Sequence, residues 1–325
     1  MEITLKECIE YLSCNDNYLI FTHAAPDGDT LGSAFALKYA LEAKGKKVKI
    51  FNPDAIPARF AFMAEGVDIC REIPEGDYTR ISIDIASPAM LKGLDEDYLN
   101  NLVFDLSIDH HFINTIRAKR LLLFAEYPAA GEIAAEITKG LNVPFDKTNA
   151  LWLYAAISSD SGCFRFSSTR PETHLTAAEL LRTGIDFAKI NRRIFEYKTE
   201  GQLALERDAY GHIEKFFGGK VAIVCLSDAV LALDYVDGND IDQINNIPRQ
   251  IAGVEVSALI RRYGDEIKVS FRSNDYYDVA ALAKSFGGGG HIHAAGCRFY
   301  TSTDDAKQKI LDILKKDFDR PDNHD

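Results

Sequence analysis

The sequence predicts an α/β protein with a doubly wound, mainly parallel sheet in an N-terminal domain and a smaller C-terminal α/β domain whose sheet is mixed. Short apolar runs alternate with segments of helical spacing through the first half, which is typical of strands joined by crossover helices. A second strand-rich unit starts near Lys220. Acidic residues and histidines stand where apolar runs end, and in parallel sheets that edge carries the functional crevice. We expect the active site there, in the cleft between the domains.

The first half contains four strand candidates, each a short apolar run: 17–22, 47–51, 79–85 and 102–108. Between the first two, apolar residues recur at helical spacing from Asp29 to Ala43. From about 145 to 217 the pattern is largely helical, and residues 151–157 predict a helix that leads into the glycine-bearing loop with Asp160.

The second unit combines strands and helices. Its predicted strands are 221–225, 254–260, 267–272 and 297–300, and its predicted helices are 278–286 and 304–318. We place a catalytic metal-binding domain at 1–187, a helical linker at 188–200 and a substrate-binding domain at 201–325.

Composition limits the function classes. The chain has 325 residues, is 46% apolar and 26% charged, and carries a formal charge of −12, which argues against tight binding of long duplex nucleic acid. A short phosphorylated substrate is still compatible, because bound cations supply a local positive field. We find no bilayer-spanning run and no signal-peptide layout. The six scattered cysteines are typical of reduced thiols. We therefore expect a cytoplasmic protein that does not bind membranes.

The first chemistry-bearing cluster follows the run 17–22. His23, Asp27 and Asp29 lie on a predicted strand-to-helix loop, which Pro26 and Gly28 would hold in a tight, extended path. Two carboxylates on alternating positions can face two metal ions, with the imidazole on one of them. The alternative is an ordinary turn in which Asp29 is the N-cap of the following helix.

Three further clusters follow the same layout. Asp84 interrupts an apolar strand, where a lone carboxylate is costly unless it is paired or bound to metal; alternatively it marks a solvated strand end. Asp109, His110 and His111 end another run, and Asp160 lies in a Ser-Gly loop where it could simply be a cap. Taken together, the clusters predict a pair of hard divalent cations, which perform phosphoryl hydrolysis.

The C-terminal unit contains a candidate anion site. The run 286–296 predicts a glycine-rich loop that enters a segment of small residues. Its consecutive glycines allow backbone amides to approach an anion, and His291 can donate to a phosphate oxygen. The run is neither a Walker loop nor a dinucleotide fingerprint; a functionless turn, or a zinc site that includes His293, are the alternatives. Arg272 and Ser273 could bind phosphate through a guanidinium fork and a hydroxyl, or Arg272 could be an ordinary surface arginine.

These motifs, in this order, resemble those of the DHH phosphoesterases, and the resemblance covers nearly the whole chain. It rests on His23-x3-Asp27-x-Asp29 with Gly32-Ser33, on Asp84, on Asp109-His110-His111, on Asp160-Ser-Gly162-x-Phe164, and on Ser270-Phe-Arg-Ser273 with Gly287-Gly-Gly-Gly-His-x-x-Ala-Ala-Gly296. The last two are similar to the C-terminal domain associated with this family. Length and two-domain layout resemble the NrnA-type nanoRNases within it.

The resemblance implies two Mn²⁺ ions, with Mg²⁺ or Co²⁺ as substitutes. One ion would be held by His23, Asp27 and Asp84. The other would be held by Asp29, Asp84, His110 and Asp160, so that Asp84 bridges the two. Mixed imidazole and carboxylate ligands favour Mn²⁺ over Mg²⁺. Two metal ions that share a bridging water lower the pKa of that water and so give a hydroxide nucleophile.

The resemblance also implies the roles of the remaining site residues. His111 would contact the substrate and protonate the leaving oxygen, and Asp109 would orient the histidines rather than ligate. The far phosphate or terminal nucleotide would be held by Arg272, Ser273, Gly288, Gly289, Gly290 and His291. The chain departs from the family at Ala129–Glu132, where relatives often carry hydroxyl residues, which puts local substrate contacts in doubt. His293 has no assigned role.

We expect an enzyme that hydrolyses short oligoribonucleotides to 5′-mononucleotides and converts pAp to AMP. The alternatives are a phosphodiesterase for pApA or for linear or cyclic dinucleotides, a pyrophosphatase or exopolyphosphatase, and a catalytically silent nucleotide sensor. The expected partners are short RNA, dinucleotides or pAp. The preferred substrate, the polarity of degradation and the oligomeric state stay open, a homodimer being one option.

Overall fold

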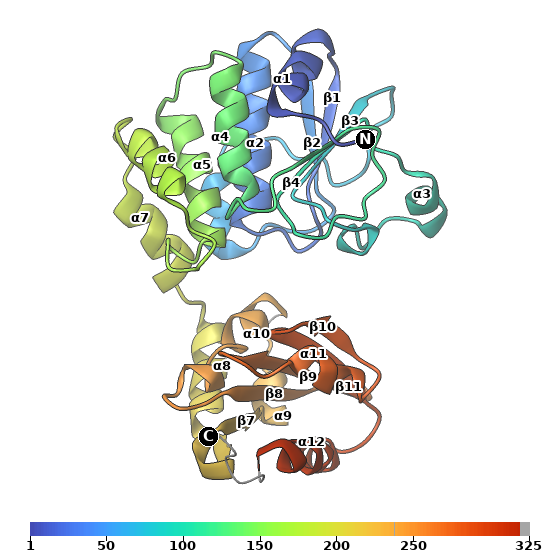
Figure 1. The fold of residues 1–325 in the computed structure, drawn as a ribbon, viewed down its shortest axis with the longest axis vertical. Coiled ribbons are helices and arrows are strands. Elements are labelled where there is room, and N and C mark those ends of the chain that lie inside the picture. Colours follow the sequence, from blue (N-terminus) through green and yellow to red (C-terminus); the bar gives the residue numbers. More distant parts are fainter. Residues whose placement is uncertain (237, 319–325) are drawn as a thin grey trace, which may run out of the picture. The chain divides into compact units, whose positions relative to one another are not determined.

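The computed structural model describes residues 1–236 and 238–318. The chain divides into two compact units, one spanning Met1–Tyr197 and the other starting at Lys198 (Figure 1). The segment 188–200 contains most of α7 (Phe187–Asn191), a π-helical turn (Arg192–Glu196) and the first residue of α8 (Glu200–Gly211). In the described residues no helix combines the length and the apolar character that a membrane crossing requires.

The first unit is built on a five-stranded sheet in which every pairing is parallel. The strand order is β2-β1-β3-β4-β5, with bounds Tyr18–Phe21 (β1), Val48–Phe51 (β2), Thr79–Ile83 (β3), Leu106–Asp109 (β4) and Leu121–Leu123 (β5). The four predicted strands are present. The last of them starts later than predicted, because Phe104 makes only an isolated bridge to Ala118. β5 was not predicted.

Helices cover this sheet unevenly. On one face α2 (Gly28–Ala43), α4 (Ala130–Gly140) and α5 (Lys147–Asp160) pack against one another, as Figure 1 shows. The opposite face carries α3 (Glu96–Asn101), loops and an aromatic cluster. In that cluster the ring of Phe21 lies 5.1 Å from those of Phe51 and Phe104. The doubly wound α/β class is therefore confirmed for this unit.

The predicted helix after the first strand is buried nearly all round, because it lies between the sheet and α5. A side chain at Gly32 would place its Cβ 2.3 Å from the carbonyl oxygen of Trp152 on α5. Only glycine therefore permits this close crossing of the two helices. The crossing brings the beginning of α2 next to the end of α5, where Asp160 lies.

The second unit has a six-stranded mixed sheet in the order β10-β11-β9-β8-β7-β6. β7 and β8 are parallel and the other pairs are antiparallel, which confirms the predicted mixed sheet. The bounds are Ile213–Phe216 (β6), Val221–Cys225 (β7), Val256–Tyr263 (β8), Glu266–Ser273 (β9), Gly289–His291 (β10) and Ala294–Phe299 (β11).

Helices cover both faces of this second sheet. α11 (Val279–Lys284) and α12 (Thr303–Phe318) pack on one face, and α8 with α9 (Asp228–Leu231) and α10 (Gly238–Ile244) on the other. Two expectations were wrong here. Residues 289–291 form an edge strand rather than a loop, and β6 occupies a segment predicted as helical.

Candidate metal centre

The six predicted metal ligands lie at or close to the carboxyl ends of β1, β3 and β4 and at the adjoining ends of α2 and α5. His23 follows β1, Asp84 directly follows β3, and His110 directly follows β4. The strand order reverses between β1 and β3. Such a switch point opens a crevice at the carboxyl edge of an open α/β sheet, and these three residues stand beside it.

One group of potential ligands consists of His23, Asp27 and Asp84. The Nε2 atom of His23 lies 3.6 Å from Oδ1 of Asp27 and 3.5 Å from Oδ2 of Asp84. Its Nδ1 atom lies 2.8 Å from the carbonyl oxygen of Ala24. A donor at Nδ1 leaves the lone pair of Nε2 directed at the two carboxylates, which is the arrangement that metal-binding histidines adopt.

A second group forms around His110. Its Nε2 atom lies 3.5 Å from Asp29 Oδ2 and 3.3 Å from Asp160 Oδ2. The same atom is 3.4 Å from Oδ1 of Asp84, the oxygen that does not face His23. Asp84 therefore presents one oxygen to each group. Within each group of three the ligand atoms lie within 4.8 Å of one another.

Two buried polar atoms in this centre have no hydrogen-bond partner among the described residues: Oδ1 of Asp84 and Nε2 of His110. Buried polar groups in folded proteins are almost always paired. A divalent cation between these two atoms would satisfy both of them. The donor set of imidazole nitrogens and carboxylate oxygens therefore fits divalent metal ions of the Mn²⁺ type.

The pKa values of the carboxylates also favour bound cations. Burial, followed by the charge of Asp84, raises the pKa of Asp29 to about 8. Burial, followed by the charge of Asp29, raises the pKa of Asp160 well above its usual value. These carboxylates repel one another and are shielded from water, and nearby cations would lower their pKa values again.

Asp84 adopts an unusual backbone conformation, with φ at +57°. Its amide donates a 2.9 Å hydrogen bond to the carbonyl of Ile108 on β4, and the residue is 3% exposed. Left-handed conformations of non-glycine residues are costly and gather at functional sites. The turn out of β3 directs the carboxylate across the sheet edge toward both histidines.

The loop from His23 to Asp29 differs from the prediction. Ala25 has φ +51°, so the loop is kinked rather than extended throughout. Asp27 is the N-cap of α2, because its Oδ1 accepts from the amides of Asp29 and Thr30. The alternative interpretation, with Asp29 as the cap, is therefore wrong.

The carboxylate of Asp29 accepts a 3.1 Å hydrogen bond from Ser33 Oγ on its own helix and also caps a second helix. It accepts hydrogen bonds from the amides of Ala130 and Gly131, at 2.7 and 2.8 Å. These are the first two residues of α4, and Ala129 before them makes no side-chain cap. The carboxylate of Asp29 thus fills the place that a capping hydroxyl at the start of α4 would take, which gives the departure at 129–132 a structural context.

Asp109 is wholly buried and makes two side-chain contacts. Its Oδ1 lies 2.9 Å from Nδ1 of His111, and its Oδ2 accepts a 2.6 Å hydrogen bond from Nδ2 of Asn114. The contact with Asp109 raises the pKa of His111. This geometry suits an orienting role for Asp109. Sequence reasoning missed Asn114, and the only signal was its position shortly after the paired histidines.

The candidate phosphate-binding residues of the second unit do not all face the same way. Strand alternation places the side chains of Arg272 and Ser273 on opposite faces of β9. Ser273 is 1% exposed, and its Oγ lies 2.9 Å from Nδ1 of His293. Ser273 therefore contacts His293 on the face opposite to Arg272, and the expected binding of phosphate by both residues stays a prediction. His291 is exposed.

The glycines of this unit have a packing role as well. A Cβ at Gly288 would lie 2.2 Å from the carbonyl oxygen of Gly296. A Cβ at Gly290, which has φ +148°, would lie 2.5 Å from the carbonyl oxygen of Ala294. The narrow hairpin of β10 and β11 thus requires glycine at both positions, whereas Gly289 has open space around it.

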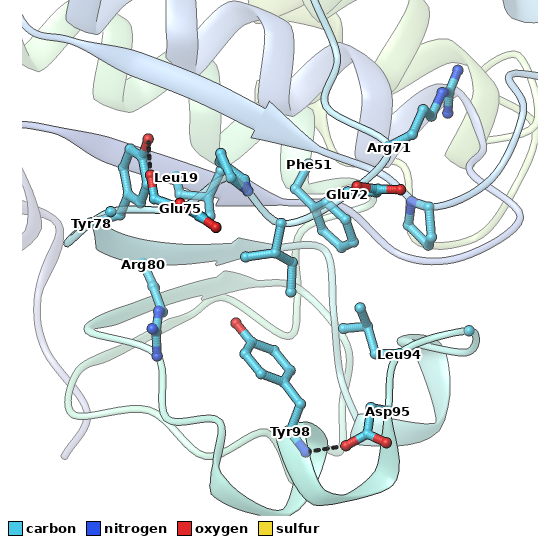
Figure 2. A pocket seen from close by; sticks show the side chains of 15 residues that line it. Leu19, Phe51, Arg71, Glu72, Glu75, Tyr78, Arg80, Leu94, Asp95 and Tyr98 are labelled. Atoms are coloured by element: carbon cyan, nitrogen blue, oxygen red, sulfur yellow. Dashed lines mark hydrogen bonds between the residues drawn. The ribbon is translucent and has the colours of Figure 1, made fainter.

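A cavity of about 560 Å³ lies elsewhere in the first unit. Its lining includes Leu19 and Phe51, whose side chains belong to the aromatic face of the sheet, away from α2 and α4. Figure 2 shows Arg80, Tyr78 and Tyr98 around it. None of the predicted ligands is among the described residues that line it. The metal centre lies instead at the carboxyl edge of the sheet, among largely buried ligand side chains.

The sequence of the chain matches two protein-family models. Residues 17–157 match the DHH family N-terminal domain, and residues 219–319 match the DHHA1 domain. The bifunctional oligoribonuclease and PAP phosphatase NrnA of Thermus thermophilus is 28% identical over 303 residues, which are 93% of this chain and 90% of the relative. The protein of the same name from Bacillus subtilis is 22% identical over 94% of this chain and 96% of its own.

Solved structures share the fold. An exopolyphosphatase-related protein from Bacteroides fragilis superposes with a TM-score of 0.83 at 22% identity, covering 97% of this chain and 98% of its own. A RecJ exonuclease bound to manganese superposes with a TM-score of 0.54 at 15% identity, covering 98% and 95%. With both domain matches in their expected order, the chain belongs to the DHH family and is a DHH phosphoesterase that carries the associated C-terminal DHHA1 domain.

Proposed function

We propose that this protein is an Mn²⁺-dependent enzyme that hydrolyses short oligoribonucleotides to 5′-mononucleotides and pAp to AMP. Family membership makes the chain a phosphoric ester hydrolase, and the proposal concerns its cofactor and its substrates. One observation carries it: the two oxygens of Asp84 serve two separate groups of ligand atoms. The names of the T. thermophilus and B. subtilis relatives, which match over nearly the whole length, support the choice of substrates.

We assign one cation to His23, Asp27 and Asp84, and the other to Asp29, Asp84, His110 and Asp160. When bound, such a pair supplies Lewis acidity and a hydroxide nucleophile at neutral pH. The protein keeps the ligand atoms close together on a rigid sheet edge, so little rearrangement accompanies binding. Asp29 and His110 are each anchored by backbone groups near the start of α4, the Ala130 and Gly131 amides and the Tyr127 carbonyl.

We propose that His111 protonates the leaving group. Its Nδ1 is engaged by Asp109, while its side chain is 39% exposed, so Nε2 is the nitrogen that can deliver a proton to the leaving oxygen. Asp109 and Asn114 fix the orientation of the ring. A positioned general acid of this kind contributes about 10²–10⁴-fold to the rate.

For the second unit we propose that Arg272 and His291 contact the distal phosphate or terminal nucleotide of the substrate, together with the backbone of Gly288, Gly289 and Gly290. Ser273 would act indirectly by fixing His293. A short substrate needs only the two cations and these few phosphate-binding groups to be held. A long duplex would need a basic surface, which a chain of formal charge −12 does not favour.

A kinetic panel tests the proposal. Metal-stripped protein, reloaded with Mn²⁺, is assayed with pAp, pApA, pGpG, short RNA, a cyclic dinucleotide, a long RNA, pyrophosphate and polyphosphate. We expect turnover of pAp and of the shortest RNAs. Preference for pApA, pGpG or the cyclic dinucleotide would favour the phosphodiesterase alternative, and faster hydrolysis of pyrophosphate or polyphosphate would contradict the proposal.

Two variants accompany the panel. Asp84→Asn removes the shared carboxylate and should abolish turnover. Asp97→Asn changes an exposed aspartate on α3 and should behave as the wild type. Binding of nucleotide by the Mn²⁺-loaded wild type without any turnover would indicate a sensor rather than an enzyme.

A further inference from the structure

The stretch of chain from Tyr127 to Gly131, at the start of α4, holds two of the proposed ligands through its backbone. The carbonyl oxygen of Tyr127 lies 3.1 Å from Nδ1 of His110. The amides of Ala130 and Gly131 donate to the carboxylate of Asp29. Both ligands belong to the same proposed cation, so any displacement of this stretch would displace the two together.

A partly buried ion pair fixes this stretch. Glu132, the third residue of α4, is 1% exposed, and its Oε1 accepts a 2.7 Å hydrogen bond from the guanidinium of Arg170. Its other oxygen accepts a 2.7 Å hydrogen bond from Thr173 Oγ1. The same guanidinium lies over the ring of Tyr127, 3.8 Å from its centroid. Arg170 therefore stacks on Tyr127 at the first end of the stretch and forms an ion pair with Glu132, the residue directly after its last end.

Arg170 also connects this stretch to the segment that follows Asp160. It is the residue before α6 (Pro171–Leu181), and its amide donates to Thr173 Oγ1, which in turn donates to Glu132. Ten residues separate Arg170 from Asp160, at the end of α5. The pair thus joins the starts of α4 and α6 on the side of the unit where all the ligands of the second cation lie.

A buried ion pair is a weak source of stability, because desolvation of the charges offsets most of their attraction. Its clearer effect is geometric, since one oxygen of Glu132 is held by Arg170 and the other by Thr173, and the planar guanidinium is also stacked on Tyr127. Partners that orient metal ligands in this way typically change metal affinity or activity by about 10–100-fold when they are removed.

We propose that Glu132 and Arg170 are positioning residues of the metal centre: they hold the Tyr127 carbonyl and the first turn of α4 so that His110 and Asp29 face one cation. Neither touches the cation or the substrate. The inference rests on the proposed metal centre, but it does not depend on which phosphoester the enzyme hydrolyses.

The test is a titration of metal-stripped protein with Mn²⁺ alone, followed by calorimetry, for wild type, Glu132→Gln and Arg170→Met. We expect the affinity of one class of site to fall by about 10–100-fold, with the other class nearly unchanged. With pAp as substrate, saturating Mn²⁺ should restore most of kcat, and KM should stay within about twofold of the wild type.

The chain offers a matched control. Lys139 on α4 and Glu179 on α6 form a second ion pair between the same two helices, but both side chains are about 40% exposed and neither approaches the ligands. Glu179→Gln should leave Mn²⁺ affinity unchanged. An equal loss of affinity in this variant would show that general helix packing is responsible and would overturn the proposal.

A double substitution separates a loss of Mn²⁺ affinity from a general loss of folding. Glu132→Leu with Arg170→Met removes both charges, so that neither charge is left unpaired, and only the buried hydroxyl of Thr173 loses its acceptor. Thermal stability should therefore be closer to that of the wild type than in Arg170→Met alone, while Mn²⁺ affinity stays low. Wild-type affinity in a folded Arg170→Met protein would refute the inference, as would a raised KM at unchanged Mn²⁺ affinity. A wild type that binds two ions yet cleaves no nucleotide would refute only the proposed function.

Discussion

The metal-free protein should lose stability as pH rises through neutrality. Burial beside Asp84 raises the pKa of Asp29 to about 8, from a usual 3.8. Burial lowers the pKa values of His23 and His110, but contacts with neighbouring carboxylates outweigh it and raise them to about 11 and about 10, from a usual 6.5. Between pH 6.5 and 8 the folded protein therefore holds protons that the unfolded chain has released.

The sign and size follow from proton linkage. The free energy of unfolding falls with pH wherever the folded state binds more protons than the unfolded state. The stability that a raised pKa contributes is complete below the unfolded pKa and is lost as pH rises through the folded one. Each extra proton corresponds to about 1.4 kcal/mol per pH unit, so a rise of about 1.5 units removes about 2 kcal/mol. We expect at least one such proton, since the three groups share one crowded site.

Urea denaturation at pH 6.5 and pH 8 measures this effect, once with a metal chelator present and once with Mn²⁺ present. In chelator the free energy of unfolding should be about 2 kcal/mol lower at the higher pH. With Mn²⁺ the difference should shrink or reverse, because ligands bind metal in their deprotonated form. Asp29→Asn should reduce the number of protons released on unfolding by about one and so flatten the dependence of the unfolding free energy on pH. Asp97→Asn should not change this dependence. Metal-free stability that is equal or higher at pH 8 would refute the electrostatic reasoning.

Three further outcomes are expected. Asp84→Asn should lower kcat by about 10³-fold or more and weaken Mn²⁺ binding in both groups, because the lost charge stabilisation is worth several kcal/mol; calorimetry and steady-state rates check this. Asn114→Ala should lower kcat by about tenfold to 10²-fold by freeing the Asp109–His111 pair, and Mn²⁺ affinity measured alongside should not change. Gly32→Ala should destabilise the fold by about 1–3 kcal/mol, since its Cβ would overlap a carbonyl of α5; Gly211→Ala, which meets open space, should be neutral or slightly stabilising in the same melts.

Much of the fold was predictable because apolar periodicity is a local signal. The first four strands of the sheet, each of four or five residues, and the buried helix that follows the first of them could be found in that way. β5 was missed because it has only three residues, fewer than the apolar runs of four to eight residues that indicate a buried strand. β6 was hidden by the helical pattern that precedes it, and its edge position leaves two of its four side chains exposed.

The ligand cluster was predictable for a related reason. Parallel strands bring their carboxyl ends to one edge, so His23, Asp84 and His110 could be expected to lie near one another. The pair Glu132–Arg170 could not be anticipated, because Glu132 was noted only within the departure at 129–132, Arg170 lies in no recognisable pattern, and the two are 38 positions apart. The opposite directions of Arg272 and Ser273, by contrast, follow from strand alternation, and the sequence already contained that information.

The left-handed turn at Asp84 limits which acidic residue can occupy this position. Aspartate and asparagine enter that region of backbone space more readily than longer side chains do. Glutamate would supply the same charge but would have to force its extra methylene into a strained, enclosed turn. Of the residues that suit the turn, aspartate alone brings two anionic oxygens, so attempts to re-engineer this enzyme for a larger ion should begin at other ligands.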